Sequence, residues 1–197
     1  KFERQYDLFN NNDLNFPEKS HLQDLFIEKS IIKKWQGRII DHQSPIFKFG
    51  YKEVNQSSLF ESSSEELKES FNPIDLTPLA LCFWRWPKIM HKGPALYFVM
   101  DKMIDSDENI ILYIGETSSA EKRWKGEHDC KNYLSCYSDY LHKANMSTKL
   151  SIRFWLDVPI KTKERRKLER TLIQTWLPPF NKETRGIWGT PFTSQIN

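Results

Sequence analysis

The chain has little cysteine and no long apolar run. Only three of its 197 residues are cysteines, Cys82, Cys130 and Cys136. This small, odd number argues against a disulfide framework and fits a reducing compartment, so we expect a cytoplasmic protein. No stretch approaches the roughly 18 apolar residues that a membrane-spanning helix needs. The start, KFERQYDLFNNND, lacks the apolar core of a signal peptide. We expect a soluble protein that does not contact a membrane.

Familiar recognition modules are also missing from the sequence. It shows no zinc-finger spacing, helix-turn-helix signature, coiled coil or internal repeat. The net charge of +3 is small, but residues 161–170, KTKERRKLER, contain six basic and two acidic side chains. A concentrated basic patch attracts polyanions such as nucleic acids. The ordinary alternative is a solvated helix face.

Residues 1–90 are predicted to form an N-terminal α/β extension. Apolar spacing predicts a helix over 21–39, and the apolar residues of 44–54, SPIFKFGYKEV, are typical of a strand. The segment 56–70 is rich in Ser and Glu, which favours an exposed loop. We expect this extension to pack on the following domain.

Residues 91–197 are predicted to form a second domain of the α+β class. Apolar runs predict a hairpin of strands over 95–101 and 109–115, and alternation predicts a third strand over 150–158. The strand 95–101 is apolar on both faces and is expected to lie centrally. Helices are predicted from Ser118, over 132–144 and over 162–176. The result is a small, three-stranded, mainly antiparallel sheet covered by helices.

Several residues with useful side chains follow one another along these elements. Tyr97 lies on the first strand in GPALY, and YIG (113–115) ends the second. An arginine and a histidine belong to the next helical segment, a glutamate lies on the last helix in LERTLIQTW, and an asparagine follows in PPFN. In order, these residues are Tyr97, Tyr113, Gly115, Arg123, His128, Glu169 and Asn181.

This arrangement resembles the GIY-YIG nuclease family over roughly residues 93–182. The family's two tripeptides correspond to ALY and YIG, its helix arginine to Arg123, its glutamate to Glu169 and its terminal asparagine to Asn181. The first tripeptide departs from the family by Ala95 and Leu96, and the turn between the tripeptides is longer than in the smallest members. The family's helper residue falls near Glu127 and His128, and both stay candidates.

The resemblance implies a metal-dependent phosphodiesterase. Glu169 would hold one Mg²⁺, for which Mn²⁺ is a possible substitute, because Mg²⁺ accepts one or two carboxylates and keeps most of its waters. Tyr97 would take the proton of the attacking water, with Tyr113 or His128 as a relay. Arg123 would clamp the phosphate oxygens. Gly115 would let the chain turn and substrate approach, and Asn181 would hold the phosphate or the last loop.

The expected substrate is double-stranded DNA, and the first expectation is a restriction-type, site-specific endonuclease. Residues 1–90 would then serve in DNA recognition or in structure. Cutting a palindrome would need a homodimer on DNA. Alternatives on the same fold are a structure-specific repair or recombination nuclease, a nucleic-acid-binding protein that no longer cuts, and an RNA-processing factor. The expected substrate contacts besides Gly115 and Asn181 are Trp124, Lys125, Lys161, Lys163 and Arg165.

Each residue also has an ordinary structural interpretation. Tyrosines on strands are often core aromatics, and Glu169 has the spacing to pair with Arg165 on its own helix. A rival site is zinc held by His128, Cys130, Cys136 and His142, although these spacings match no compact zinc pattern.

Overall fold

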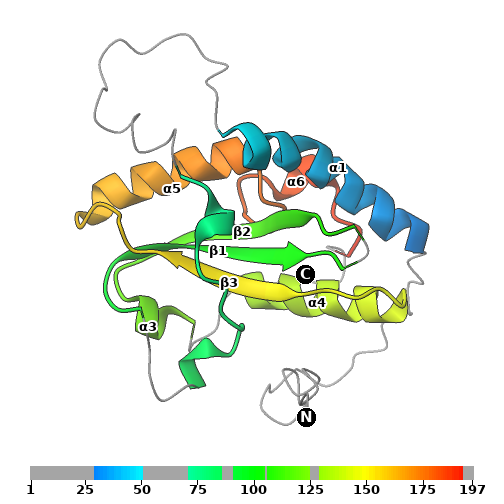
Figure 1. Cartoon of the computed structure of the whole chain (residues 1–197), viewed down its shortest axis with the longest axis horizontal. Coiled ribbons are helices and arrows are strands. Elements are labelled where there is room, and N and C mark those ends of the chain that lie inside the picture. The colour runs from blue at the N-terminus through cyan, green and yellow to red at the C-terminus, as the bar shows by residue number, and fades with distance from the viewer. Residues whose placement is uncertain (1–28, 51–70, 86–90, 105, 125–128, 193–197) are drawn as a thin grey trace.

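The computed structural model describes residues 29–50, 71–85, 91–104, 106–124 and 129–192 (Figure 1). Its elements are α1 (Lys29–Phe49), the short 3₁₀ helices η2 (Pro73–Asp75) and η3 (Phe83–Arg85), β1 (Ala95–Lys102), β2 (Asn109–Thr117), α3 (Ala120–Arg123), α4 (Asp129–Lys143), β3 (Leu150–Trp155), α5 (Thr162–Trp176) and α6 (Arg185–Trp188). The predicted α+β class is confirmed. No helix in the described part is both long and apolar enough to cross a membrane.

The three strands form one antiparallel sheet in the order β2-β1-β3. The central position expected for the first strand is confirmed, and every residue of β1 except Lys102 is buried. The register of β1 and β2 shifts between Val99 and Met100, which leaves Leu112 as an extra residue in β2. Such a bulge bends a strand and increases its twist.

Helices cover both faces of the sheet, as Figure 1 shows. Alternate β1 side chains point to opposite faces. One face packs on α5 and contains Leu96, Phe98, Met100, Leu172, Ile173 and Trp176. The other packs on α4 and contains Tyr97, Val99, Leu134, Tyr137 and Leu141. This double coverage explains why β1 reads as an uninterrupted apolar run.

The outer edge of β2 is closed by side chains and a loop. Gln43 of α1 accepts from the Ile111 N–H at 2.7 Å and donates to the Ile111 carbonyl at 3.1 Å. Next along the edge, the Phe180 N–H donates to the Leu112 carbonyl at 3.0 Å. An edge strand whose backbone groups are paired in this way cannot accept another strand.

The prediction of a strand over 44–54 is wrong for its described part. Helix α1 continues through Pro45 to Phe49. Ile46 and Phe47 pack on the α5 side of the core, with the Phe47 and Trp176 ring centroids 4.5 Å apart, whereas Phe49 is exposed. This packing outweighs the strand-like composition and the proline within the helix.

Residues 71–85 of the extension pack on the edge of β3. Leu79 and Ile152 exchange two backbone hydrogen bonds of 2.9 Å. Arg153 donates from Nη1 to the carbonyls of Pro73 and Leu76. Two predicted boundaries also change, because β2 continues to Thr117 and β3 ends at Trp155.

Candidate active site

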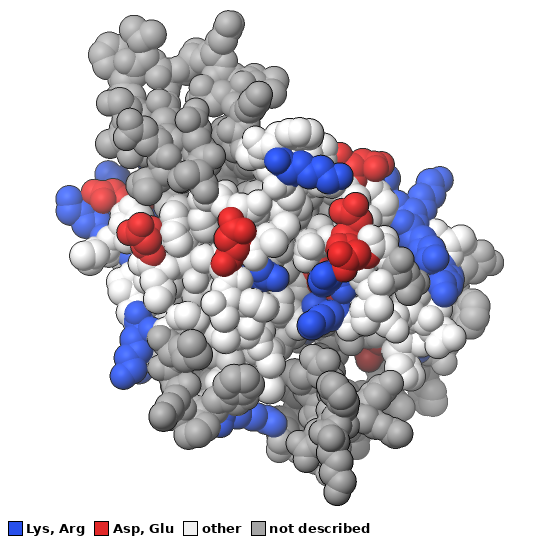
Figure 2. Space-filling view, in the orientation of Figure 1, with Lys and Arg blue, Asp and Glu red and all other residues white. Residues whose placement is uncertain are grey.

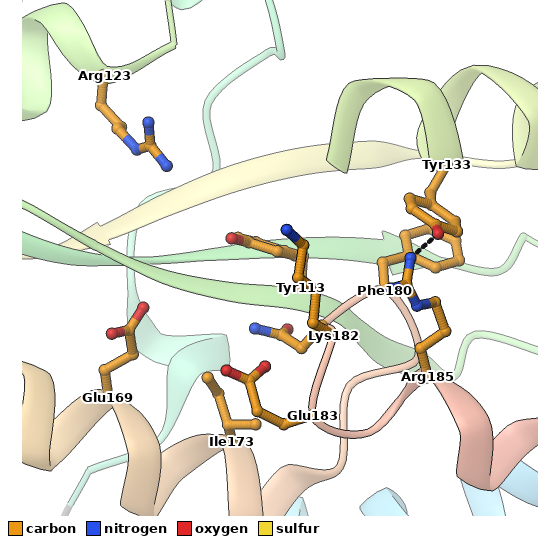
Figure 3. A pocket seen from close by; sticks show the side chains of 10 residues that line it. Tyr113, Arg123, Tyr133, Glu169, Ile173, Phe180, Lys182, Glu183 and Arg185 are labelled. Carbon is orange, nitrogen blue, oxygen red and sulfur yellow. Dashed lines mark hydrogen bonds between the residues drawn. The ribbon is translucent and has the colours of Figure 1, made fainter. Parts of the chain in front are cut away.

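A pocket of about 350 Å³ opens between β2, α3, α4, α5, the loop after α5 and the start of α6 (Figure 3). This volume falls within the usual range for small-ligand sites. Its lining residues are Tyr113, Arg123, Tyr133, Glu169, Ile173, Phe180, Asn181, Lys182, Glu183 and Arg185. Four of the residues expected from the sequence, Tyr113, Arg123, Glu169 and Asn181, are therefore brought to one cavity.

The two tyrosines lie side by side on one face of the sheet. Tyr97 pairs with Gly115 across the strands, and Tyr113 pairs with Val99. Their ring centroids are 6.0 Å apart. Tyr113 is half-buried and lines the pocket, whereas Tyr97 is completely buried behind it. Tyr113 is thus the tyrosine that can reach a ligand.

Gly115 makes room for the ring of Tyr97. A Cβ at Gly115 would lie 2.4 Å from both Cζ and Oη of Tyr97, far closer than such atoms approach. The residue is inside β2, not at its end, so the expected turn at Gly115 is wrong. The glycine is needed because a neighbouring side chain crosses its position.

Arg123 at the end of α3 is anchored on Tyr97. Its Nε donates to Tyr97 Oη at 3.1 Å, and its Cζ lies 5.8 Å from the centre of the tyrosine ring. The side chain is half-buried and faces the pocket. A guanidinium carries five N–H donors in a planar fork, a geometry that suits bidentate contact with an anion.

Burial raises the pKa of both phenols. Burial raises the pKa of Tyr97 well above its usual 10, Tyr113 adds to this effect, and the charge of Arg123 opposes it. Burial, followed by the neighbouring Cys130, raises the pKa of Tyr113 to about 12, while hydrogen bonding with Tyr97 and the charge of Arg123 act in the opposite direction. At neutral pH each tyrosine therefore carries its proton.

Glu169 of α5 is held by the main chain of β2. The Glu116 N–H donates to Oε1 of Glu169 at 2.9 Å. Burial raises the pKa of Glu169 to about 7, and the charges of Glu116 and Glu183 also raise it, against that backbone bond and Arg166. The carboxylate is thus poorly neutralised by its surroundings.

That carboxylate fits a hydrated magnesium ion. The bond from Glu116 uses only Oε1, and a cation would offset the repulsion from the neighbouring acids. Mg²⁺ keeps several waters and needs only one or two protein carboxylates. No group of three His, Cys, Asp or Glu side chains able to hold a metal occurs among the described residues, so Glu169 would have to act with substrate oxygens and water.

Arg165 is structural, which corrects its expected role as a substrate contact. It is 1% exposed, and its Nε donates to Oε2 of Glu116 at 2.9 Å. Its Nη1 donates to the carbonyls of Pro159 and Ile160. A buried guanidinium with these partners cannot reach a phosphate. Glu169 accepts a hydrogen bond from the backbone of β2, whereas the ordinary interpretation had paired it with Arg165 on its own helix.

Asn181 fastens the loop after α5. Its Oδ1 accepts from the Ile114 N–H at 3.0 Å and its Nδ2 donates to the Ile114 carbonyl at 2.8 Å. It is 3% exposed. Of its two expected roles, the structure shows loop attachment: the side chain continues the edge closure of β2 that Gln43 begins.

Trp124 is a core residue and not a surface contact, contrary to expectation. It is buried, and its ring meets Tyr97 edge-on with centroids 5.9 Å apart. Lys161 and Lys163 are exposed and lie outside the pocket lining. Lys125, Glu127 and His128 are outside the described residues, so the structure does not choose the helper residue.

The basic segment 161–170 is partly neutralised within the fold. Arg165 and Arg166 both bind Glu116, and Lys161 lies 3.3 Å from Glu164. On the face shown in Figure 2, basic and acidic side chains are mixed. Of the zinc alternative, His128 lies outside the described residues, and among the described ones no group of three His, Cys, Asp or Glu side chains could hold a metal.

The structure adds pocket residues that the sequence analysis missed. They are Tyr133, Ile173, Phe180, Lys182, Glu183 and Arg185. The charged run KETR directly after Asn181 was the available signal. Tyr133 gave none, because its helix only comes to the pocket through the tertiary fold.

No protein-family model matches this chain, and no curated protein or solved structure matches it. The resemblance to GIY-YIG nucleases therefore stays a hypothesis carried by the order of the residues and the geometry of the pocket.

Proposed function

We propose that this chain is a divalent-metal-dependent endonuclease that hydrolyses DNA phosphodiester bonds, with a restriction-type, site-specific enzyme as the first candidate. The observation that carries the proposal is the meeting of Tyr113, Arg123 and Glu169 in one pocket. They come from a strand, a short helix and a long helix. A tyrosine, an anchored arginine and an under-neutralised carboxylate supply the groups that phosphodiester hydrolysis needs.

Arg123 would bind the non-bridging oxygens of the scissile phosphate. Tyr97 holds Nε of Arg123 at 3.1 Å, so the guanidinium is oriented before the ligand arrives. Preorganised donors stabilise charge that develops in the transition state without reorganising. In this arrangement Tyr97 acts as a positioning residue.

Tyr113 would meet the attacking water. Its hydroxyl is protonated at neutral pH, so it must lose its own proton before it can accept one from water. The positive charge of Arg123 favours that loss. This shifts the proton-accepting role expected for Tyr97 to Tyr113, because Tyr113 lines the pocket and Tyr97 is buried behind it.

Glu169 would hold the metal ion, and the Glu116 N–H fixes the direction of its carboxylate. When bound, Mg²⁺ would supply positive charge to the phosphate and the leaving oxygen.

The test uses three substrates: supercoiled plasmid, a branched DNA junction and structured RNA. Each is incubated with Mg²⁺, Mn²⁺ or EDTA, beside Glu169→Gln and the control Glu164→Gln. Glu164 is on the same helix but exposed, outside the pocket lining. Thermal unfolding verifies that both variants fold.

We expect discrete, metal-dependent plasmid fragments from the wild type and from Glu164→Gln, and none from Glu169→Gln. Sedimentation on DNA then tests whether two copies assemble. Cleavage of the junction alone or of RNA alone would move the assignment to repair or to RNA processing. Binding without any cleavage would leave a nucleic-acid-binding protein.

A further inference from the structure

The end of the pocket away from Arg123 and Glu169 holds a second arginine (Figure 3). Arg185 donates from Nη1 to the hydroxyl of Tyr133, and its Cζ lies 5.2 Å from the centre of the Tyr133 ring. Its backbone N–H donates to the Asn181 carbonyl at 2.9 Å. Hydrogen bonds therefore hold both the main chain and the side chain of Arg185. The proposed nuclease chemistry uses neither group.

Tyr133 is itself fixed in the core. It is 5% exposed and stacks on Phe180 with ring centroids 5.5 Å apart. Arg185 is therefore oriented by a rigid partner, as Arg123 is oriented by Tyr97. A guanidinium has five N–H donors, so a bond to one tyrosine leaves donors for an anion.

The charges between the two arginines are mixed. Figure 3 places Tyr113, Lys182 and Glu183 between the Arg123 end and the Arg185 end. The lining as a whole carries three cations, Arg123, Lys182 and Arg185, against the acids Glu169 and Glu183. Two anchored arginines at opposite ends, with an aromatic face between them, suit an anion with two separated negative groups.

We propose that Arg185 binds a second phosphate of the nucleic-acid strand, so that the pocket takes two successive phosphates with one nucleoside between them against Tyr113. This inference rests on the proposed function for the identity of the ligand. Arginine forks match phosphate oxygens bidentately, and aromatic faces stack on any base.

The test measures binding of thymidine 3′,5′-bisphosphate and of the two thymidine monophosphates by titration calorimetry in EDTA. We expect the wild type to bind the bisphosphate about 10- to 100-fold more tightly than either monophosphate, because a second charge-assisted contact forms. Arg185→Gln should lose that advantage while it keeps the affinity for one monophosphate. Tyr133→Phe should lose part of it, because the arginine is no longer oriented by the hydroxyl.

Arg170→Gln is the matched control, because Arg170 is exposed on α5 and outside the pocket lining. It should bind the bisphosphate as the wild type does. Glu183→Gln should bind more tightly, since it removes a negative charge from the lining. With single-stranded oligonucleotides, Arg185→Gln should lower the slope of log affinity against log salt by about 0.7.

The proposal is overturned if the wild type shows no preference for the bisphosphate, if it binds none of the nucleotides, or if folded Arg185→Gln keeps the preference. These measurements need neither metal nor cleavage. A wild type that cuts DNA but lacks the preference would refute the second phosphate site alone. A wild type with the preference that never cuts would refute the nuclease alone.

Discussion

The backbone N–H of Glu116 donates a 2.9 Å hydrogen bond to Oε1 of Glu169, joining the end of β2 to the middle of α5. The side chain of Glu116 also accepts from Nε of Arg165 at 2.9 Å and from Nε of Arg166 at 3.2 Å. One residue thus orients the candidate metal ligand through its main chain and fastens the helix through its side chain.

Replacing that side chain should weaken metal binding without touching the metal ligand. Glu116→Gln leaves the buried Arg165 without its carboxylate, and we expect the free energy of unfolding to fall by about 2–4 kcal/mol. The backbone bond to Glu169 remains in this variant, but α5, which carries Glu169, loses its ion pairs to β2, so Mg²⁺ affinity should fall about 10- to 100-fold. Calorimetric Mg²⁺ titration and urea unfolding measure the two effects.

Arg166→Gln is the control. At a side chain that is 62% exposed, this change should alter the free energy of unfolding by less than about 1 kcal/mol. Unchanged Mg²⁺ affinity in Glu116→Gln would contradict this role.

A methyl group at Gly115 should displace Tyr97. Because the new Cβ would lie 2.4 Å from the ring, we expect Gly115→Ala to lower the free energy of unfolding by about 1–3 kcal/mol. Nuclease activity should also fall, because Arg123 is anchored on Tyr97 and would lose its orientation. Chemical unfolding and plasmid cleavage are the measurements. Gly186→Ala is the control, because a Cβ there meets nothing within 4 Å. Equal stability of the two variants would refute the packing argument.

The rate of cleavage should rise with pH if Tyr113 accepts the proton of water. With a pKa of about 12, its ionised fraction grows about tenfold per pH unit between pH 6 and 9. Single-turnover rates at saturating Mg²⁺ should follow that slope in the wild type. Tyr113→Phe should lower the rate about 10²- to 10⁴-fold and flatten the profile. A pH-independent wild-type rate would exclude this assignment.

A buried carboxylate on β1 should make stability depend on pH. Burial raises the pKa of Asp101, while hydrogen bonds from Thr148, Tyr137 and the Lys149 N–H lower it. Because the folded pKa is the higher one, the associated stability is complete below the unfolded pKa and is lost as pH rises through the folded pKa.

Removing one donor should enlarge that loss. Tyr137 donates to Asp101 Oδ2 at 2.7 Å, so Tyr137→Phe leaves the ionised carboxylate less well paired. We expect a loss of about 1–2 kcal/mol, greater at pH 8 than at pH 4. Urea unfolding across this range measures it. Tyr140→Phe, a buried tyrosine of the same helix, is the control. A pH-independent difference between Tyr137→Phe and wild type would show that Asp101 is not the titrating group.

The sequence alone determined much of the fold of residues 95–176. Both strands of the hairpin and the helix 162–176 follow from local apolar patterns. The structure keeps these elements because β1 and α5 bury their apolar side chains in a shared core. The sequence also shows the order of the candidate site residues, because that order depends only on residue type and spacing. These residues are Tyr97, Tyr113, Arg123 and Glu169.

Only the tertiary structure decided which of these side chains reach a ligand. Tyr97 and Tyr113 look equivalent along the chain, yet packing against Gly115 and Trp124 buries the first and leaves the second in the pocket. The sequence pattern predicts that Arg165 is a surface cation. In the structure it is buried and paired with Glu116, which is distant in sequence. Arg185 joins the site through Tyr133. Burial and partner choice arise from contacts between distant segments, and local sequence patterns do not encode them.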